Sequence, residues 1–268
     1  MSVFDIIFAY FNKLHWLLMR CFCYPWEYIH FKQYNQVKEV GCIDCYCSDN
    51  NKVFGNGKTL SAVMKVCSLY KHYNGLEYLD FNGKKHYNNI RIYSNLELHG
   101  VPFVPLVNLH QIVSYTENRQ PDDVAIFLID EANSVLNSRN FKNNLSFDVV
   151  KSIVTCRHYG IYLVLVGQRF NYLDAFVRDM CDRVIMCRYS PFTRLLTHYA
   201  YNAYDLNSGN ANPRCVAYDL ACVKHKYFGL YDTLGEVSNL AYDNSYDQRV
   251  REVPNPFEKQ KKRGRKNV

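Results

Sequence analysis

The sequence lacks a run of apolar residues long enough to cross a membrane. Residues 1–30 are rich in apolar and aromatic side chains, but Asn12, Lys13 and His15 interrupt them, and a spanning helix needs about 20 such residues in a row. We therefore expect residues 1–37 to form an aromatic helical segment that packs on the main domain. The alternative is a helix lying in a membrane interface, with its Trp and Tyr rings at headgroup level.

The first stretch is not followed by a signal-peptide cleavage site of small residues, and the 11 cysteines are an odd number. Both observations argue against a secreted protein built on disulfides, so we expect reduced thiols in a cytoplasm. A paired zinc-knuckle spacing is also missing, because Cys42-x-x-Cys45 is matched only by Cys21-x-Cys23. Cys42 and Cys45 lie in a mostly apolar run. We expect buried strand cysteines there, with a zinc site as the alternative.

Acidic residues are fewer than basic ones, which gives a net charge of +7. Residues 244–268 look like a polar tail that carries much of this excess, namely Lys259, Lys261, Lys262, Arg263, Arg265 and Lys266. A solvated tail is one interpretation. The other is an arm that docks on nucleic acid or on an anionic membrane surface.

The region between these ends, residues 38–243, has no internal repeat and alternates short apolar runs with helical patterns. Such alternation predicts an α/β fold with a mainly parallel sheet flanked by helices. The expected strands are residues 40–47, 91–94, 125–129, 161–166 and 183–187. The expected helices are residues 58–72, 106–113 and 148–158. The runs at 125–129 and 161–166 are apolar throughout, as in strands covered on both faces.

The segment VFGNGKTLSAV, residues 53–63, contains most of a phosphate-binding loop. Gly57, Lys58 and Thr59 match the end of the motif G-x-x-x-x-G-K-[ST], but Lys52 stands where the motif has its first glycine. In such loops, backbone N–H groups cradle phosphate oxygens, the lysine reaches the β- and γ-phosphates of ATP, and the hydroxyl binds Mg²⁺. The nucleotide-binding candidates are Gly55, Asn56, Gly57, Lys58, Thr59 and Leu60.

The segment AIFLIDEAN, residues 125–133, is an apolar strand that ends in two carboxylates. In P-loop ATPases the first acid at such a strand end holds Mg²⁺, and the second polarises the attacking water. These roles would fall on Asp130 and Glu131. A strand that simply ends at exposed acids is the alternative, although the position of the acids after the Gly-Lys-Thr sequence suits an ATPase.

A second apolar strand, residues 161–166, is followed by Gln168, whose amide would sense the γ-phosphate. Ligands of open α/β sheets bind outside the carboxyl ends of parallel strands, so we expect Gln168 to converge with the loop and the two acids. Arg157, Arg178 and Arg183 are candidates for an arginine finger that reaches a neighbouring subunit's nucleotide. We include Arg178 in the candidate site, and surface ion pairing is the alternative for each of the three.

Five segments in this order resemble the zonula occludens toxin (Zot) domain family: GKTLSAV, IRIYSNLEL, FLIDEAN, RHYGIYLVLVGQRFNYLDAFVRDMCD and KYFGLYDT. The resemblance spans residues 42–233. Members are ATPases of filamentous and other bacterial viruses, a branch of the FtsK–HerA group of DNA pumps. The resemblance implies a P-loop NTPase fold with ATP and Mg²⁺ as cofactors. It also implies loop residues Lys58 and Thr59, the Mg²⁺ acid Asp130, the catalytic acid Glu131 and the strand-tip sensor Gln168.

The resemblance further implies a viral ATPase that translocates DNA as a hexameric ring, in genome packaging or virion morphogenesis. Contacts to DNA phosphates are independent of sequence, as a pump requires. Capsid or other virion assembly proteins would be further partners. Filamentous-phage members carry a transmembrane segment after the ATPase domain, whereas the residues after 233 are polar and basic here. We therefore expect a motor in the host cytoplasm, peripheral to the inner membrane or virion-associated.

Two alternatives remain open at this stage. One is an assembly or extrusion ATPase at the inner membrane, which would contact the membrane through residues 1–30. The other is a non-catalytic DNA-binding relic of the fold. Lys52 in place of glycine favours the relic, and the presence of all five matched site residues opposes it.

Overall fold

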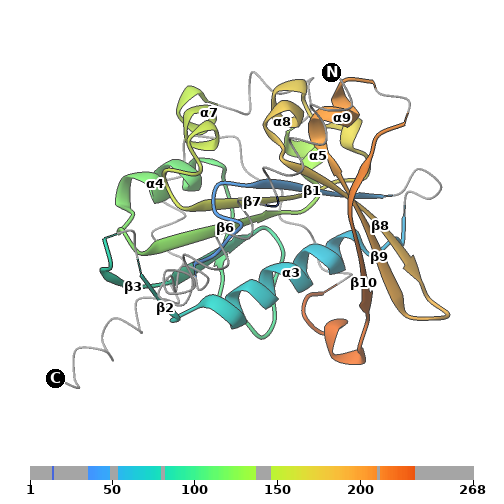
Figure 1. Ribbon diagram of the computed structural model, residues 1–268, viewed down its shortest axis with the longest axis horizontal. Coiled ribbons are helices and arrows are strands. Elements are labelled where there is room, and N and C mark those ends of the chain that lie inside the picture. The colour runs from blue at the N-terminus through green and yellow to red at the C-terminus, as the bar shows by residue number, and fades with distance from the viewer. Residues whose placement is uncertain are drawn as a thin grey trace.

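The computed structural model describes Leu14 and residues 36–48, 54–79, 82–136, 146–209 and 212–232 (Figure 1). The expectations for the aromatic segment, for Lys52 and for the basic tail concern residues outside these ranges, apart from Leu14. In the part of the chain that is described, no helix combines the length and the apolar character that a membrane span needs.

The fold is built on an eight-stranded sheet with the order β10-β9-β8-β1-β7-β6-β4-β5. Six neighbouring strands are parallel: β1 (Ile43–Ser48), β4 (Asn89–Ser94), β5 (Val104–Pro105), β6 (Asp123–Ile129), β7 (Ile161–Val166) and β8 (Arg183–Ser190). Beyond β8 the sheet continues with two antiparallel strands, β9 (Leu195–Asn202) and β10 (Cys215–Cys222). A separate antiparallel pair joins β2 (Glu77–Leu79) to β3 (Lys85–Tyr87). The predicted mainly parallel α/β sheet is confirmed.

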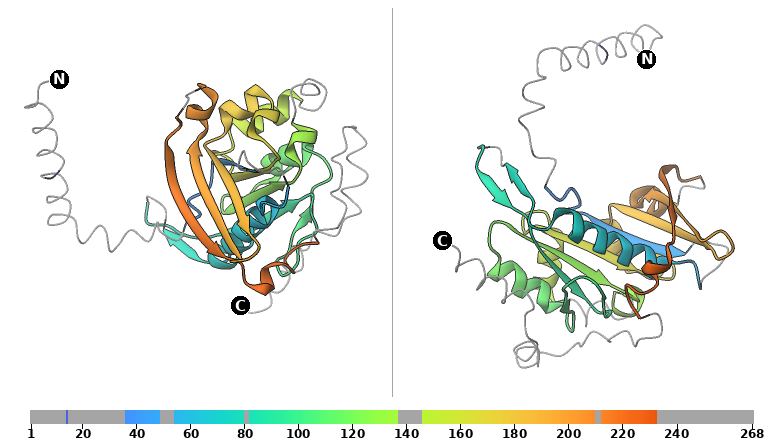
Figure 2. Two further views of the ribbon diagram at one scale, coloured as in Figure 1. Left: turned by 90° about the vertical axis from the view of Figure 1, so that its right-hand side faces the viewer. Right: turned by 90° about the horizontal axis from the view of Figure 1, so that it is seen from below.

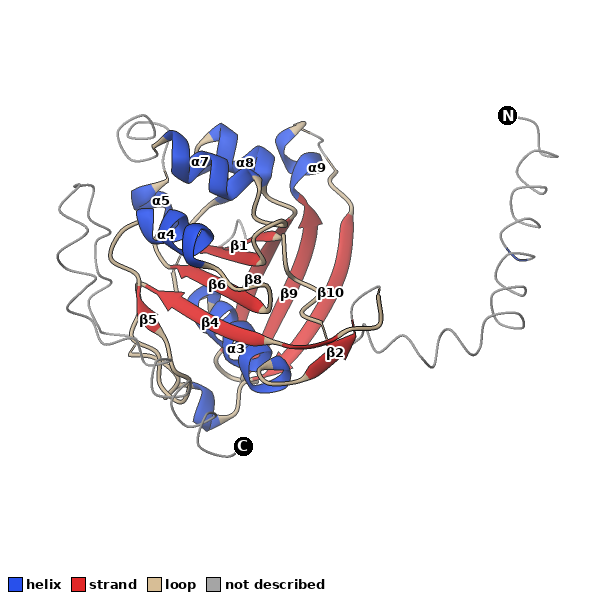
Figure 3. Ribbon diagram, turned by 90° about the vertical axis from the view of Figure 1, so that its left-hand side faces the viewer, coloured by secondary structure: helices blue, strands red, loops and turns tan. Residues whose placement is uncertain are grey.

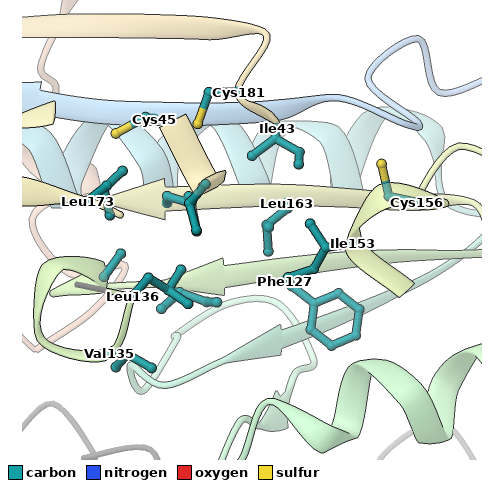
Figure 4. Packing of buried hydrophobic residues seen from close by; sticks show 14 of the residues in the cluster. Ile43, Cys45, Phe127, Val135, Leu136, Ile153, Cys156, Leu163, Leu173 and Cys181 are labelled. Carbon is teal, nitrogen blue, oxygen red and sulfur yellow. The ribbon is translucent and has the colours of Figure 1, made fainter. Parts of the chain in front are cut away.

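Helices cover both faces of the sheet (Figures 1 and 3). One face carries α3 (Lys58–Tyr73), whose Val63 and Val66 pack in one core with Ile126 of β6. The other face carries α4 (His110–Asn118), α5 (Ala132–Val135), α7 (Phe147–Val154), α8 (Ala175–Met180) and α9 (Ala203–Asn207). Phe127 and Ile153 pack in this second core (Figure 4). Because both faces are covered, β6 and β7 are buried at every position, which explains their continuous apolar runs.

Two helices differ from the sequence prediction at their ends. The helix expected from residue 106 begins at His110, because side chains cap the turn before it: Asn108 Oδ1 accepts from the His110 N–H at 2.9 Å, and Gln111 Oε1 accepts from the Val107 N–H at 2.7 Å. The helix expected to run to residue 158 ends at Val154. It is followed by a turn in which Gly160 has a φ of +66°.

The strands β9 and β10 were not predicted from the sequence; we call them the wing (residues 195–202 and 215–222). Figure 2 shows the wing at one side of the sheet. Side chains on β10 are exposed along nearly its whole length, including Val216, Tyr218 and Leu220, so the strand lacks the alternating burial that marks a strand in sequence. Cys215 and Cys222, at the two ends of β10, are the exposed cysteines among those described; the others are buried or, for Cys42, half-buried.

Two short 3₁₀ helices complete the described elements. The first, η2 (Phe170–Tyr172), follows the tip of β7, and the second, η3 (His225–Tyr227), follows β10. After η3 the chain returns to the segment that follows β4, where Tyr231 forms a bridge with Leu98 and the His99 N–H donates to the carbonyl of Leu230 at 2.7 Å. This return brings the end of the described chain close to the loops that follow the parallel strands.

Candidate nucleotide-binding site

The phosphate-loop candidate lies between the end of β1 and the start of α3. Gly57 is the N-cap of α3 and has a φ of +74°, and Gly55 has a φ of +70°. Both values lie in the left-handed region that favours glycine. The first N–H groups of a helix have no partner within it, and the glycine cap brings no side chain that could accept from them. The start of α3 is therefore arranged to receive an anion.

Lys58, the first residue of α3, points back to the end of β1. Its Nζ donates a hydrogen bond to Ser48 Oγ at 3.1 Å. Ser48 is buried and its backbone N–H donates to the carbonyl of Gln168 at 3.3 Å. Lys58, the tip of β1 and the tip of β7 thus meet at the carboxyl edge of the parallel sheet.

Thr59 and Asp130 are in contact at this edge. The Thr59 hydroxyl lies 3.3 Å from each carboxylate oxygen of Asp130. Burial raises the pKa of Asp130 to about 6, and the Glu131 charge acts in the same direction, whereas hydrogen bonds from the Glu131 backbone and Thr59 and the charge of Lys58 lower it. A buried carboxylate with a raised pKa is a group for which a bound cation would offset the cost of burial.

The backbone of Asp130 is held by Asn95, which follows β4. Asn95 Nδ2 donates to the Asp130 carbonyl at 2.9 Å, and Asn95 Oδ1 accepts from the Asp130 N–H at 2.8 Å. Asn95 is buried, so neither peptide group has water as a substitute partner. Asn95 was not among the site residues predicted from the sequence. The signal in the sequence was a polar residue directly after β4, a strand with alternating burial that pairs with the strand before the acids.

Glu131 follows Asp130 in an unusual backbone conformation. Its φ is +52°, which is uncommon for a residue with a side chain, and the Glu131 side chain is exposed. The conformation is held by Ser134, whose N–H and hydroxyl both donate to the Glu131 carbonyl at 2.8 Å. Strained residues of this kind are frequent at functional sites, where neighbouring contacts stabilise them.

Asn133, in α5, packs against the tip of β7. A Cβ placed on Gly167 would lie 2.7 Å from Asn133 Oδ1, so a larger residue at this position would displace the Asn133 amide. Both polar atoms of the Asn133 amide are buried, and neither has a hydrogen-bond partner among the described residues. Gly167 directly precedes Gln168, so Asn133 links the acid-bearing turn to the strand tip that carries the proposed sensor.

The three arginine-finger candidates lie toward the other end of the parallel strands. Arg183 begins β8 and forms a two-pronged ion pair with the buried Asp44, with contacts of 2.6 and 2.9 Å. Arg178 Nη1 reaches Asn207 Oδ1 at 3.4 Å. Arg157 packs on Gly41, which precedes β1. None of the three contacts the described residues of this chain's own loop, and contact with a neighbouring subunit stays a prediction.

Tyr231, from the segment KYFGLYDT, lies near the acids. Burial raises its pKa to about 12, and the charge of Asp130 acts in the same direction. The half-buried Tyr231 packs on the cluster formed by Leu60, Leu196 and Val223. This terminal segment therefore contributes to the wall of the site, a role that the sequence did not indicate.

The residues present suit a Mg²⁺–nucleotide complex. Mg²⁺ prefers oxygen ligands and in nucleotide sites takes one or two from the protein, with phosphates and water supplying the rest. Thr59 and Asp130 offer a hydroxyl and a carboxylate in contact. In the described part of the chain, His, Cys, Asp and Glu form no group of three or more that could hold a metal by itself. The proposed zinc ligands Cys21 and Cys23 lie outside the described residues.

The structure therefore brings together most of the residues singled out in the sequence. Lys58, Thr59, Asp130 and Gln168 meet at the carboxyl edge of the sheet, as does the exposed Glu131. Asn56 and Leu60 are buried beside them. The chemical role of each of these residues stays a prediction.

The chain is similar to several known proteins. The sequence model of the family described as zonular occludens toxin (Zot) matches residues 53–237. Comparison with curated proteins gives no match. One similar solved structure is the N-terminal domain of zonular occludens toxin from Neisseria meningitidis, with 18% identity, a TM-score of 0.45, and coverage of 71% of this chain and 99% of that chain.

Two further solved structures are similar to this chain. The genome packaging NTPase B204 from Sulfolobus turreted icosahedral virus 2, in complex with ATP-gammaS, shares 14% identity at a TM-score of 0.37, over 69% of this chain and 98% of that chain. EccC from Thermomonospora curvata (ATPases 2 and 3) shares 11% identity at a TM-score of 0.37, over 81% of this chain and 42% of that chain. Because the family model covers more than half of the sequence, the chain belongs to the zonular occludens toxin (Zot) family.

Proposed function

We propose that this chain hydrolyses ATP with Mg²⁺ and couples hydrolysis to the movement of DNA in viral genome packaging or virion morphogenesis. The observation that carries the proposal is the contact between Thr59 and Asp130 beside the glycine-capped start of α3. That arrangement places a cation-binding pair next to a phosphate-binding helix start. Membership of the Zot family is consistent with it. The proposal extends to this chain the genome-packaging role of B204.

Each residue of the site has a distinct part in this proposal. The N–H groups at the start of α3 and the ammonium of Lys58 bind the phosphates. Thr59 and Asp130 hold Mg²⁺, which neutralises phosphate charge in the reaction. Glu131 orients the attacking water and takes its proton, and Gln168 contacts the γ-phosphate from the tip of β7. Arg178 would act on the nucleotide of a neighbouring subunit.

The partners follow from the same proposal. DNA would be bound through its phosphates, without regard to sequence, and we propose that the basic residues at 244–268 take part in these contacts. The active form would be a ring of identical chains, which we propose to be hexameric, acting with capsid or other virion assembly proteins. We propose that this ring works in the host cytoplasm, either peripheral to the inner membrane or associated with the virion.

The experiment that tests the proposal is ATP hydrolysis by the purified full chain, with and without DNA. We expect DNA of unrelated sequences to stimulate hydrolysis equally. Lys58→Ala should abolish nucleotide binding and hydrolysis, whereas Glu131→Gln should abolish hydrolysis and keep binding, because the exposed Glu131 side chain acts on water and not on the phosphates.

Two results would contradict the proposal. A folded chain that binds DNA and neither binds nor hydrolyses ATP would be a relic of the fold. Hydrolysis that survives Lys58→Ala would place the active site elsewhere. Membrane fractionation of host cells addresses the remaining alternative, since an extrusion ATPase inserted in the inner membrane would stay with the membranes in high salt.

A further inference from the structure

The glycine cap of α3 is in contact with the wing. A Cβ placed on Gly57 would lie 2.5 Å from Cδ2 of Leu196 in β9 and 3.3 Å from Cβ of Tyr189 in β8. Leu196 is fully buried and forms a small core with Leu60 of α3 and Val223, which follows β10. The phosphate-loop candidate is therefore packed directly against strands that lie outside the loop and its helix.

A chain of hydrogen bonds joins the same wing to the carbonyl of Gly57. Ser61 in α3 is buried, and its hydroxyl donates to the Gly57 carbonyl at 2.7 Å, alongside the Ser61 N–H at 2.8 Å. Nε2 of His198 in β9 lies 2.8 Å from Ser61 Oγ. Because the single hydroxyl proton of Ser61 is used by Gly57, the ring of His198 acts as the donor to Ser61.

Two neighbours of the His198 ring act in opposite directions. The Asp219 carboxylate beside Nδ1 favours a proton on Nδ1, whereas the Ser61 hydroxyl, whose proton goes to Gly57, requires the N–H on Nε2. Burial lowers the pKa of His198, with Asp219 opposing the shift, so the ring is neutral at neutral pH and has one N–H to give. The other ring nitrogen, Nδ1, faces the exposed carboxylate of Asp219 at 3.6 Å, which is too long for a direct hydrogen bond. The buried thiol of Cys187 also borders Ser61, and burial raises its pKa to about 12, so it remains protonated.

We propose that His198 is a positioning residue for nucleotide binding: through Ser61 it holds the Gly57 carbonyl and so orients the peptide groups that receive phosphate. The loop has Lys52 in place of the first glycine of the motif. Gly57 is then supported from outside the loop, by Leu196 through packing and by His198 through hydrogen bonding to Ser61. This inference rests on the proposed nucleotide site and assigns part of its geometry to the wing.

The test compares the full chain with His198→Ala, Ser61→Ala and the double variant. The readouts are the Kd of a fluorescent ATP analogue and the kcat and KM of hydrolysis. Losing one hydrogen bond that shapes the binding site should raise Kd and KM about fivefold, with kcat changed by less than about twofold. If His198 acts through Ser61, the double variant should be no weaker than Ser61→Ala alone.

Two further variants separate positioning from folding. His198→Gln keeps an N–H donor on a side chain of similar reach, and should restore Kd to within about twofold of the original. Asp219→Asn changes the group beside the opposite ring nitrogen and should leave Kd unchanged. Urea unfolding of each variant shows whether a change in Kd follows a change in stability.

Three outcomes would overturn the inference. They are an unchanged Kd in His198→Ala, additive effects of the two single substitutions, and an effect of Asp219→Asn as large as that of His198→Ala. A wild-type chain that binds no nucleotide would contradict the proposed function and this inference together. Nucleotide binding that is indifferent to His198 would contradict this inference alone.

Discussion

The hydroxyl of Thr59 lies 3.3 Å from both carboxylate oxygens of Asp130, although 71 positions separate the two residues in the chain. The contact joins the first turn of α3 to the tip of β6. Because Asp130 is buried, its negative charge is unfavourable in the free protein, and the Mg²⁺ of a bound nucleotide complex would offset that charge.

That charge balance predicts a pH dependence. Burial raises the pKa of Asp130 from its ordinary value near 4 to about 6, so the native state binds this proton more tightly than the unfolded state does. The group therefore supports stability below about pH 4, and this support is lost as the pH rises through 6. Asp130→Asn should be more stable than wild type at about pH 8, by about 2 kcal/mol, and equally stable at about pH 4.

Urea unfolding of the nucleotide-free protein at the two pH values measures this difference. The same variant should lose the stabilisation that Mg²⁺ with ATP gives to wild type, because Asn has no negative charge to hold the cation. A variant that is less stable than wild type at about pH 8 would show that the charge of Asp130 has no cost in the free protein.

Asn95 should be required for the geometry of the acids. Asn95→Leu leaves the N–H and carbonyl of Asp130 buried without partners, which should cost about 2 kcal/mol or more and lower kcat for ATP hydrolysis. Asn74→Leu is a matched control, since Asn74 Oδ1 accepts from the Ile90 N–H at 3.0 Å, on the same sheet and away from the acids. It should reduce stability with kcat unchanged. Equal losses of kcat in the two variants would mean that Asn95 contributes to stability only and does not set the geometry of the acids.

The sequence predicted the sheet where its strands have a continuous apolar run. The strands β6 and β7 are buried on both faces, so their residues are apolar apart from Asp123 at the start of β6, and their limits were predicted to within two residues. In β10 of the wing, by contrast, burial does not constrain the residue types. β10 is exposed on both faces, and no periodic burial is imposed on its residues, so composition carried no signal for it.

The site residues could be listed from sequence because each is the end of a recognisable pattern. The residues that contact and orient them could not be predicted in this way. Asn95 and His198 reach the site only through tertiary contacts that join segments far apart in sequence, by side chains whose types are common everywhere. Asn133 was identified only from the structure, because its amide packs against Gly167 where a Cβ would otherwise lie.

Gly57 should tolerate no side chain. In Gly57→Ala the left-handed φ of +74° adds strain, and the new methyl would press on buried Leu196. Gly75→Ala is the control. Gly75 has a φ of +79° and open space around it, so this substitution adds backbone strain without a steric clash. We expect Gly75→Ala to cost about 1 kcal/mol with normal nucleotide binding. Gly57→Ala should cost about twice as much or more and abolish binding. Equal losses in the two variants would mean that the wing does not confine the loop.

Gly167 and Asn133 should be coupled. Gly167→Ala puts a methyl 2.7 Å from Asn133 Oδ1 and should destabilise the fold by about 1–3 kcal/mol through overpacking. Adding Asn133→Ala removes the clash, so thermal unfolding of the double variant should return toward that of wild type. If Asn133 serves only as packing, hydrolysis should return as well. If its unpaired amide acts on Gln168 or the nucleotide, stability should recover and kcat should not.

Two exposed cysteines allow thiol-reactive reagents to label the wing. Cys215 and Cys222 are exposed at the two ends of β10, whereas burial raises the pKa of the thiols at Cys67, Cys181 and Cys187 and keeps them protonated and unreactive. Among the described residues, a maleimide dye added to the folded protein would therefore attach to this strand without any engineered site. The strand whose neighbour carries His198 thus brings its own pair of labelling positions, from which its movement relative to the phosphate loop can be followed as nucleotide binds.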